Sequence, residues 1–425
     1  MCRASHLLRS RKTGVARRTD HKAGAIPCDL GKVVTITGAR IALGARTAIK
    51  ADLWVTRGRL SLSPVRCSIS PVLDLSGYLV LPGLINAHDH LELNLFPNLG
   101  CGVYPDATAW AEDIYHPRKS PIKEQLAVPK SARLRWGAIK NLLSGVTTVA
   151  HHNPLPPAAI RKDLPVRLVS RFGWAHSLRF CPDWPRRSQA TSRRYPFIIH
   201  AAEGITEAAR REITMLESAG ALHSSTVLVH GVAIGRKQLA MVSSAGCSLV
   251  WCPSSNHFTL GRTLDREILG SGVPIALGSD SAMTAKGDLL DELRFAGRTV
   301  PAERLYDMVT STAARILKLP SGFGEIRDGG PADLLVVRDD GATPARSLLR
   351  AVPKLVMVAG RIELVCTDCG IRGLEKSLDT RYWLTVGGRG AYFLSQPVES
   401  LVEETRGTLR EEIKLSGKVI SSWQT

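Results

Sequence analysis

The chain has 425 residues, long enough for one large barrel or for roughly two to three domains. Its composition, 44% hydrophobic and 22% charged, is typical of a soluble globular protein, and no apolar run approaches the ~20 residues of a membrane span. The formal charge of +18 is concentrated in two arginine-rich stretches, 3–22 and 161–194, without a nucleic-acid-binding motif. We therefore expect neither nucleic acid nor a membrane as a partner.

Nine scattered cysteines argue against a disulfide scaffold and favour reduced thiols in the cytoplasm.

The chain changes character several times along its length. Basic residues dominate the start, and we expect residues 1–29 to form a disordered tail. Glycine-punctuated β-rich runs at 30–80 and again at 317–365 predict two parts of one small composite β-sandwich. Between them, residues 81–316 alternate strand-like and helical runs, the pattern of a parallel β/α fold. Residues 366–425 are expected to form a C-terminal extension at an edge of the fold or at the contact of a homodimer.

The strand-like runs of the middle part end almost uniformly in His, Asp, Glu or Asn. Functional residues of a (β/α)8 TIM-type barrel come from the C-terminal ends of its strands, so this pattern predicts such a barrel. Seven runs are found rather than eight, at 78–90, 145–152, 167–177, 196–203, 225–233, 247–256 and 274–280. The segment between the third run and the next is too short for a full strand and two helices. One β/α unit is therefore missing, degenerate or not recognised.

The strand ends carry residues that suit a metal ion. His88 and His90 alternate in an extended run, so both imidazoles project from the same face. His200, His230 and Asp280 end later strands, which a barrel would bring together on its axis. Imidazole nitrogens and a carboxylate oxygen favour one divalent transition metal, zinc first and iron second, with an open position for water.

A family resemblance rests on five motifs that occur in the family's order: GLINAHDH, HAAE at 200–203, LVHG at 228–231, CPSSN at 252–256 and LGSDS at 277–281. With these motifs, the chain resembles the amidohydrolase superfamily in its mononuclear, deaminase-like branch, which includes cytosine, guanine and adenosine-derivative deaminases and triazine hydrolases. The late text GEIRDGGPADLLVV also resembles the second-domain signature of that family.

The resemblance implies roles for individual residues. His88, His90, His200 and Asp280 would bind one metal, while His230 would polarise the water or the leaving group. Glu203, three residues after His200, would shuttle a proton, and Asp280 would accept one from the metal-activated water. No lysine follows a recognised strand where binuclear relatives bridge two metals, which favours a single ion.

Further strand-end residues are candidates for contact with a small-molecule substrate: Asn256, Ser281, His176, Trp174 and His152. Asn and Ser in such turns are equally common as backbone caps, and the others also suit packing roles. Arg118 and Lys119 stand where adenosine-type deaminases carry a carboxylate, which disfavours a nucleoside substrate of that kind.

The sequence therefore predicts a metal-dependent hydrolase of non-peptide C–N bonds that deaminates an amino-substituted heterocycle or amidine. Hydrolysis of an amide or halide on a related ring is the alternative within the same chemistry. A non-catalytic amidohydrolase-like scaffold is a third interpretation, but such proteins typically lose ligands, and every ligand remains here.

Overall fold

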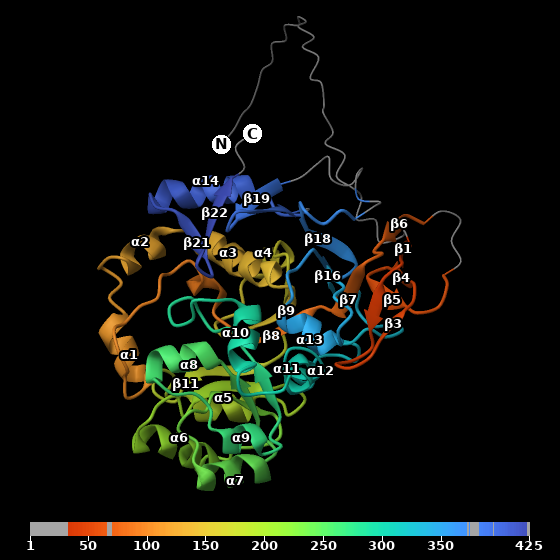
Figure 1. Cartoon of the computed structure of the whole chain (residues 1–425). Coiled ribbons are helices and arrows are strands. Elements are labelled where there is room, and N and C mark those ends of the chain that lie inside the picture. The colour runs from red at the N-terminus through yellow and green to blue at the C-terminus, as the bar shows by residue number, and fades with distance from the viewer. Residues whose placement is uncertain (1–32, 66–69, 372–373, 375–381, 394, 423–425) are drawn as a thin grey trace, which may run out of the picture.

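The computed structural model describes residues 33–65, 70–371, 374, 382–393 and 395–422. The expected basic tail, residues 1–29, lies outside the described residues. Figure 1 shows the β/α part at one end of the molecule and the C-terminal segment at the other. In the part of the chain that the structure describes, no helix is long and apolar enough to cross a membrane.

Eight parallel strands build the β/α part. Three belong to one sheet, in the order β10-β9-β8, and five to another, in the order β11-β12-β13-β14-β15. Their bounds are β8 Leu84–Asp89, β9 Val146–His151, β10 Arg167–Leu168, β11 Gly173–Ser177, β12 Phe197–Ala201, β13 Thr226–His230, β14 Ser248–Trp251 and β15 Ile275–Leu277.

Two hydrogen bonds join the two sheets at the C-terminal ends of their strands. The Asp280 N–H, just beyond β15, donates to the His88 carbonyl of β8 at 3.1 Å. The His152 Nε2–H, just beyond β9, donates to the Ala175 carbonyl of β11 at 3.0 Å. The eight strands therefore follow one another around a barrel-like arrangement whose C-terminal ends meet.

The strand that the sequence did not locate is β11. The third strand-like run, 167–177, is divided between β10 and β11, which only residues 169–172 connect. A parallel crossover that contains a helix needs a dozen or more residues. The third β/α unit therefore lacks its helix, and β10 pairs with β9 while β11 pairs with β12.

Helices follow the other strands and cover the outside of the barrel. They are α3 Lys130–Leu143, α4 Ala158–Lys162, α5 Trp184–Ala190, α6 Glu207–Ser218, α7 Arg236–Ser244, α8 Pro253–Leu260, α9 Arg266–Gly270, α10 Leu289–Ala296, α11 Ala302–Met308 and α12 Ser311–Ile316. In α6, Thr206 caps the first turn by accepting from the Ala209 N–H, and Ala209, Ile213 and Leu216 are buried. Their spacing of four and three residues places one apolar stripe toward the barrel.

A long insertion after β8 covers one side of the strand ends. It contains the 3-10 helix η1 (Leu91–Leu93) and the helices α1 (Ala107–Ile114) and α2 (Ile122–Ala127). Phe96 and Ile122 of this insertion pack with Met283, which lies beyond β15. The Ala107 N–H donates to the Glu203 carbonyl at 3.0 Å and therefore ties α1 to the end of β12.

Two antiparallel-rich sheets combine strands from both ends of the chain. The smaller has the order β5-β4-β1-β6, and the larger has the order β21-β22-β19-β20-β18-β17-β16-β7-β2-β3. The N-terminal strands are β1 Val34–Thr37, β2 Arg40–Ala42, β3 Ala48–Lys50, β4 Leu53–Thr56, β5 Arg59–Ser61, β6 Val72–Asp74 and β7 Tyr78–Pro82. One buried cluster includes Ile36 and Leu53 from the smaller sheet and Leu334 and Val336 from the larger.

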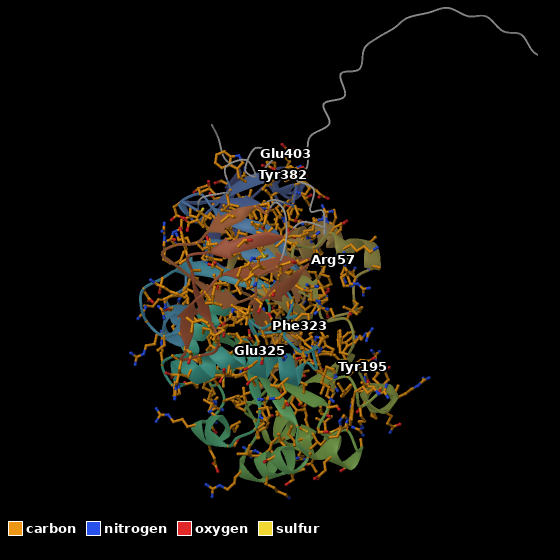
Figure 2. The ribbon with its side chains drawn as sticks, turned by 90° about the vertical axis from the view of Figure 1, so that its right-hand side faces the viewer. Arg57, Tyr195, Phe323, Glu325, Tyr382 and Glu403 are labelled. Carbon is orange, nitrogen blue, oxygen red and sulfur yellow. The ribbon has the colours of Figure 1, made fainter. Side chains whose placement is uncertain are left out.

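The C-terminal segment lengthens the larger sheet. Its elements after α12 are β16 Leu334–Arg338, α13 Pro344–Leu349, β17 Leu355–Val358, β18 Arg361–Cys366, β19 Tyr382–Val386, β20 Arg389–Phe393, α14 Val398–Leu409, β21 Ile413–Leu415 and β22 Lys418–Ser422. Figure 2 shows Tyr382 of β19 and Glu403 of α14 together at the end of the molecule opposite the green helices of the barrel. The segment also reaches α3, where the Trp136 Nε1–H donates to Thr405 at 2.7 Å.

Candidate metal centre

The five predicted strand-end residues converge. His88 lies in β8 and His90 directly precedes η1, while His200 lies in β12, His230 ends β13 and Asp280 follows β15. All five are buried. Two overlapping sets, His88 with His200 and His230, and His88 with His90 and Asp280, place their ligand atoms within 4.8 Å of one another.

The separations between these atoms suit a single small cation. His88 Nε2 lies 3.1 Å from His200 Nε2 and 3.6 Å from Asp280 Oδ1, and His90 Nε2 lies 3.7 Å from the same oxygen. Ligands at about 2.0–2.1 Å from a tetrahedral zinc ion are about 3.3 Å apart. The donor set of imidazoles and one carboxylate therefore fits a divalent metal in both chemistry and spacing.

Hydrogen bonds on the far side of two rings fix the nitrogen that faces the centre. His200 Nδ1 donates to the His176 carbonyl at 2.5 Å, and a carbonyl can only accept. His230 Nδ1 lies 2.7 Å from Asn256 Oδ1 and donates to it. Both rings therefore carry their proton on Nδ1 and present the Nε2 lone pair inward, as a metal ligand requires.

The electrostatics favour neutral imidazoles at His88, His200 and His230 and an ionised carboxylate at Asp280. Burial lowers the pKa of His88 to about 3 and lowers the pKa of His200 well below its usual value. Burial alone would raise the pKa of Asp280, but the imidazoles of His88, His230 and His90 outweigh it and lower this pKa well below its usual range. Neutral imidazole and ionised carboxylate are the forms that bind a metal.

Local hydrogen bonds hold the Asp280 carboxylate in place. Ser255 Oγ donates to Oδ2 at 2.6 Å, Thr284 Oγ1 lies 3.2 Å from the same oxygen, and the Ser281 N–H donates to Oδ1 at 2.8 Å. Ser281, a predicted substrate contact, therefore bonds Asp280 through its backbone. Sequence reasoning missed Ser255 and Thr284, because a hydroxyl in a helix start or in a turn gives no sequence signal for its partner.

Three strand ends adopt left-handed backbone conformations. The φ angles are +54° at Ala202, +74° at His230 and +53° at Asp280. Such conformations cost about 1–3 kcal/mol at residues other than glycine and persist where the surrounding structure requires them. They turn the chain sharply at the points where functional side chains leave the strands.

Glu203 lies beside the metal-binding group. Its Oε1 is 3.4 Å from His230 Nε2. Burial, followed by the nearby Asp280 charge, raises the pKa of Glu203 well above its usual value. The raised pKa favours the protonated carboxyl, which is the form that can donate a proton to a substrate atom.

An open cavity of about 410 Å³ leads to this group. It is lined by Glu203, His200 and His176, by Glu112 of α1 and by Arg179 after β11, among others. His176, which the sequence predicts as a substrate contact, therefore lines the cavity. A larger cavity of about 730 Å³ lies between the C-terminal hairpin and the loops after β8 and β15, but none of the five convergent residues lines it.

Four other predicted substrate contacts lie around the metal-binding group and are not among the residues that line the 410 Å³ cavity: His152, Trp174, Asn256 and Ser281. The His152 ring packs 4.2 Å from the His200 ring, measured between centroids, and 5.6 Å from the Trp174 ring. Asn256 orients His230, as described above. Sequence reasoning missed Arg179 and Glu112, because Arg179 lies beyond the strand-like run 167–177 and Glu112 lies in the insertion after β8.

Comparison with known proteins is consistent with this geometry. The family model for the amidohydrolase family matches residues 187–362. The 5-methylthioadenosine/S-adenosylhomocysteine deaminase of Pyrococcus furiosus is 27% identical over 360 residues, covering 68% of this chain and 83% of that protein. The protein of the same name from Haloquadratum walsbyi is 28% identical over 338 residues, covering 65% and 75%.

Solved structures share the fold. An adenosine deaminase from Xanthomonas campestris with bound zinc superimposes with a TM-score of 0.67 and 17% identity, covering 89% of this chain and 97% of that one. A triazine hydrolase variant gives a TM-score of 0.66 and 19% identity, covering 89% and 100%. With the eight parallel strands, these likenesses identify a TIM-barrel-like fold.

Proposed function

We propose that the chain is a member of the amidohydrolase superfamily, in its deaminase-like branch, and a metal-dependent hydrolase that deaminates an amino-substituted heterocycle. The carrying observation is the convergence of His88, His90, His200 and Asp280 next to Glu203, whose pKa is raised well above its usual value by burial. Hydrolysis of a C–N bond at such a ring needs an activated water and a proton for the leaving nitrogen. These residues supply both requirements at one place.

We propose that His88, His90, His200 and Asp280 hold one divalent ion. Such an ion would lower the pKa of a coordinated water from 15.7 toward about 7. Zinc is the first candidate, because it prefers imidazole and carboxylate donors in a compact set and because the similar Xanthomonas campestris structure contains it. Iron is the second candidate, because imidazole also suits that metal.

The remaining residues move protons and orient groups. Asp280 is ionised and can accept a proton from the attacking water at its carboxylate. Glu203 can deliver a proton to the ring nitrogen or to the leaving nitrogen, which makes the leaving group neutral. His230, held by Asn256, keeps Nε2 toward the same space and can polarise the group under attack.

The lining of the cavity bears on the substrate. Arg179 and Glu112 place one cation and one anion at its wall, so a polar substituent on the heterocycle would find partners there. The relatives named above are deaminases of adenosine derivatives, whereas Arg118 and Lys119 disfavour a nucleoside substrate of that kind. We therefore include both nucleosides and free amino-heterocycles in the test.

Hydrolysis of an amide or of a halide would use the same residues, and the triazine hydrolase likeness extends to the fold alone. The product distinguishes these reactions. Deamination releases ammonia, amide hydrolysis releases a carboxylate and an amine, and dehalogenation releases halide. No contact in the cavity favours the second or third reaction over the first.

The test measures bound metal and ammonia release with purified protein. 5-Methylthioadenosine, S-adenosylhomocysteine, adenosine and a set of free amino-heterocycles are the substrates. We expect about one metal ion per chain and ammonia from at least one compound. Glu203→Gln should keep the metal and lose turnover by ~10² to 10⁴. His200→Ala should lose the metal.

Three results would contradict the proposal. Full metal content in His200→Ala would remove this histidine from the ligand set. Near-normal turnover in Glu203→Gln would remove Glu203 from the proton transfer. Wild-type protein that binds no metal after supplementation would instead favour the non-catalytic scaffold.

We also infer that the two sheets around Ile36 and Leu334 form the composite β-sandwich expected from the sequence. Their shared buried cluster supports this inference. A small-molecule substrate, a cytoplasmic location and a homodimer complete the proposal. Sedimentation of the purified chain tests the homodimer, and fractionation of cells tests the location.

A further inference from the structure

A buried lysine lies beside the metal centre. Lys140, on α3, is only 2% exposed. Its Nζ donates to Asn94 Oδ1 at 2.7 Å and lies 3.4 Å from Ser279 Oγ and 3.9 Å from Asp89 Oδ2. A lysine ammonium is almost never buried without a partner, because removing the charge from water is costly. The partner here is the Asp89 carboxylate.

Asp89 is fully buried and accepts hydrogen bonds from several parts of the fold. Asn94 Nδ2 donates to Oδ1 at 2.7 Å, while Asn141 Nδ2 at 2.7 Å and Ser279 Oγ at 3.1 Å donate to Oδ2. Asn86 Nδ2 is a further donor at 3.3 Å. These bonds come from the loop after η1, from α3, from the segment after β15 and from β8. The carboxylate therefore connects four elements at one buried point.

This network reaches the ligands through the backbone. Asp89 stands between His88 and His90, so fixing its side chain fixes the chain that carries both imidazoles. Ser279 directly precedes Asp280, and its N–H donates to Asn86 Oδ1 at 3.1 Å. The network therefore links the β8 segment to the segment after β15, which together carry three of the four proposed ligands.

We propose that Lys140 is a positioning residue for the metal centre, acting through Asp89 and Ser279. Its ammonium neutralises the Asp89 carboxylate and keeps the two ligand-bearing segments at one separation. Without the ammonium, Asp89 would be a buried charge without compensation, and the network would rearrange or take in water. This inference rests on the proposed metal-dependent function but concerns only the geometry of the binding group.

The test compares two substitutions on the same helix. Lys140→Met removes the charge and keeps the length of the side chain. Ile139→Ala, at the neighbouring buried position, leaves a cavity without touching the network and serves as the matched control. Both variants are expected to unfold at a lower temperature than the wild type.

Two readouts separate positioning from general destabilisation. Metal affinity, measured by competition with a chelator, should fall about 10- to 100-fold in Lys140→Met, the usual loss when a partner of a metal ligand is removed. The visible absorption of the cobalt(II)-loaded protein, which reports ligand geometry, should also change. Ile139→Ala should retain both the wild-type affinity and the wild-type spectrum.

A second variant keeps the test decisive if Lys140→Met does not fold. Ser279→Ala removes the hydroxyl that joins the Lys140–Asp89 pair to the Asp280 segment, with little change in volume. It should lower metal affinity in the same direction and alter the cobalt spectrum. Wild-type affinity and spectrum in Ser279→Ala, or equal losses in Ile139→Ala, would overturn the proposal. A wild-type protein that binds no metal would instead contradict the proposed function.

Discussion

Removal of one hydroxyl, in Ser255→Ala, should weaken the metal centre without removing a ligand. Ser255 Oγ donates to Asp280 Oδ2 at 2.6 Å, and this bond turns Oδ1 toward His88 and His90. A hydrogen bond to a charged group contributes about 1.5–3 kcal/mol. Thr284 also contacts Oδ2, so we expect a loss near the lower limit, about 1.5 kcal/mol. That loss corresponds to about tenfold weaker metal binding.

The neighbouring residue supplies the control. Ser254 lies in the same helical turn, but its hydroxyl and its N–H both bond Glu292 rather than a ligand. Chelator competition should therefore show wild-type metal affinity in Ser254→Ala and about tenfold lower affinity in Ser255→Ala. Equal affinities in the two variants would refute the conclusion that the Ser255 hydroxyl orients Asp280.

Three further predictions concern pH, ring orientation and metal removal. Burial raises the pKa of Glu292 from 4.5 to about 7. The folded protein therefore binds this proton more tightly than the unfolded chain does. The free energy of unfolding should fall by up to about 3 kcal/mol as the pH rises from 4.5 to 7. Glu292→Gln, which mimics the protonated form, should remove this part of the pH dependence in urea unfolding, and an unchanged slope would show that Glu292 is ionised in the fold. Asn256→Leu should free the His230 ring and lower turnover about 10- to 100-fold with metal content unchanged; normal turnover would separate Asn256 from the reaction. Removing the metal with a chelator should lower the melting temperature, because metal at 100 times its Kd stabilises the fold by about 2.7 kcal/mol. Added zinc should restore the original melting temperature. An unchanged melting temperature would mean that the folded chain does not bind the ion.

The residues that converge could be predicted because their signal is local. An apolar run precedes each of the five convergent residues, and parallel strands bring such positions to one end of a barrel: His88, His90, His200, His230 and Asp280. No knowledge of distant contacts is needed for that step. The hydroxyls of Ser255 and Thr284 carry no comparable signal, because their partner depends on how α8 and the segment after β15 pack.

The fourth strand shows a different limit. The run 167–177 has the composition of one continuous strand, and the sequence contains no turn signal strong enough to divide it. The division appears only in the pairing, because β10 bonds β9 and β11 bonds β12. Pairing is a property of neighbouring strands, so a run that changes neighbours looks the same in the sequence as one that does not.

Locating β11 also bears on the number of metal ions. Binuclear relatives bridge two ions with a carboxylated lysine that follows a barrel strand, and the sequence left open whether an unlocated strand carried one. In the described structure β11 ends at Ser177 with His176 beside the cavity, and Leu178 and Arg179 follow. The buried Lys140 belongs to α3 and bonds Asn94, so its ammonium is engaged elsewhere. Asp280 is the single carboxylate among the proposed ligands, and the residues after β11 include no lysine that could bridge two ions. Elemental analysis should therefore find one ion per chain. Two ions would require a bridging group that these residues do not provide.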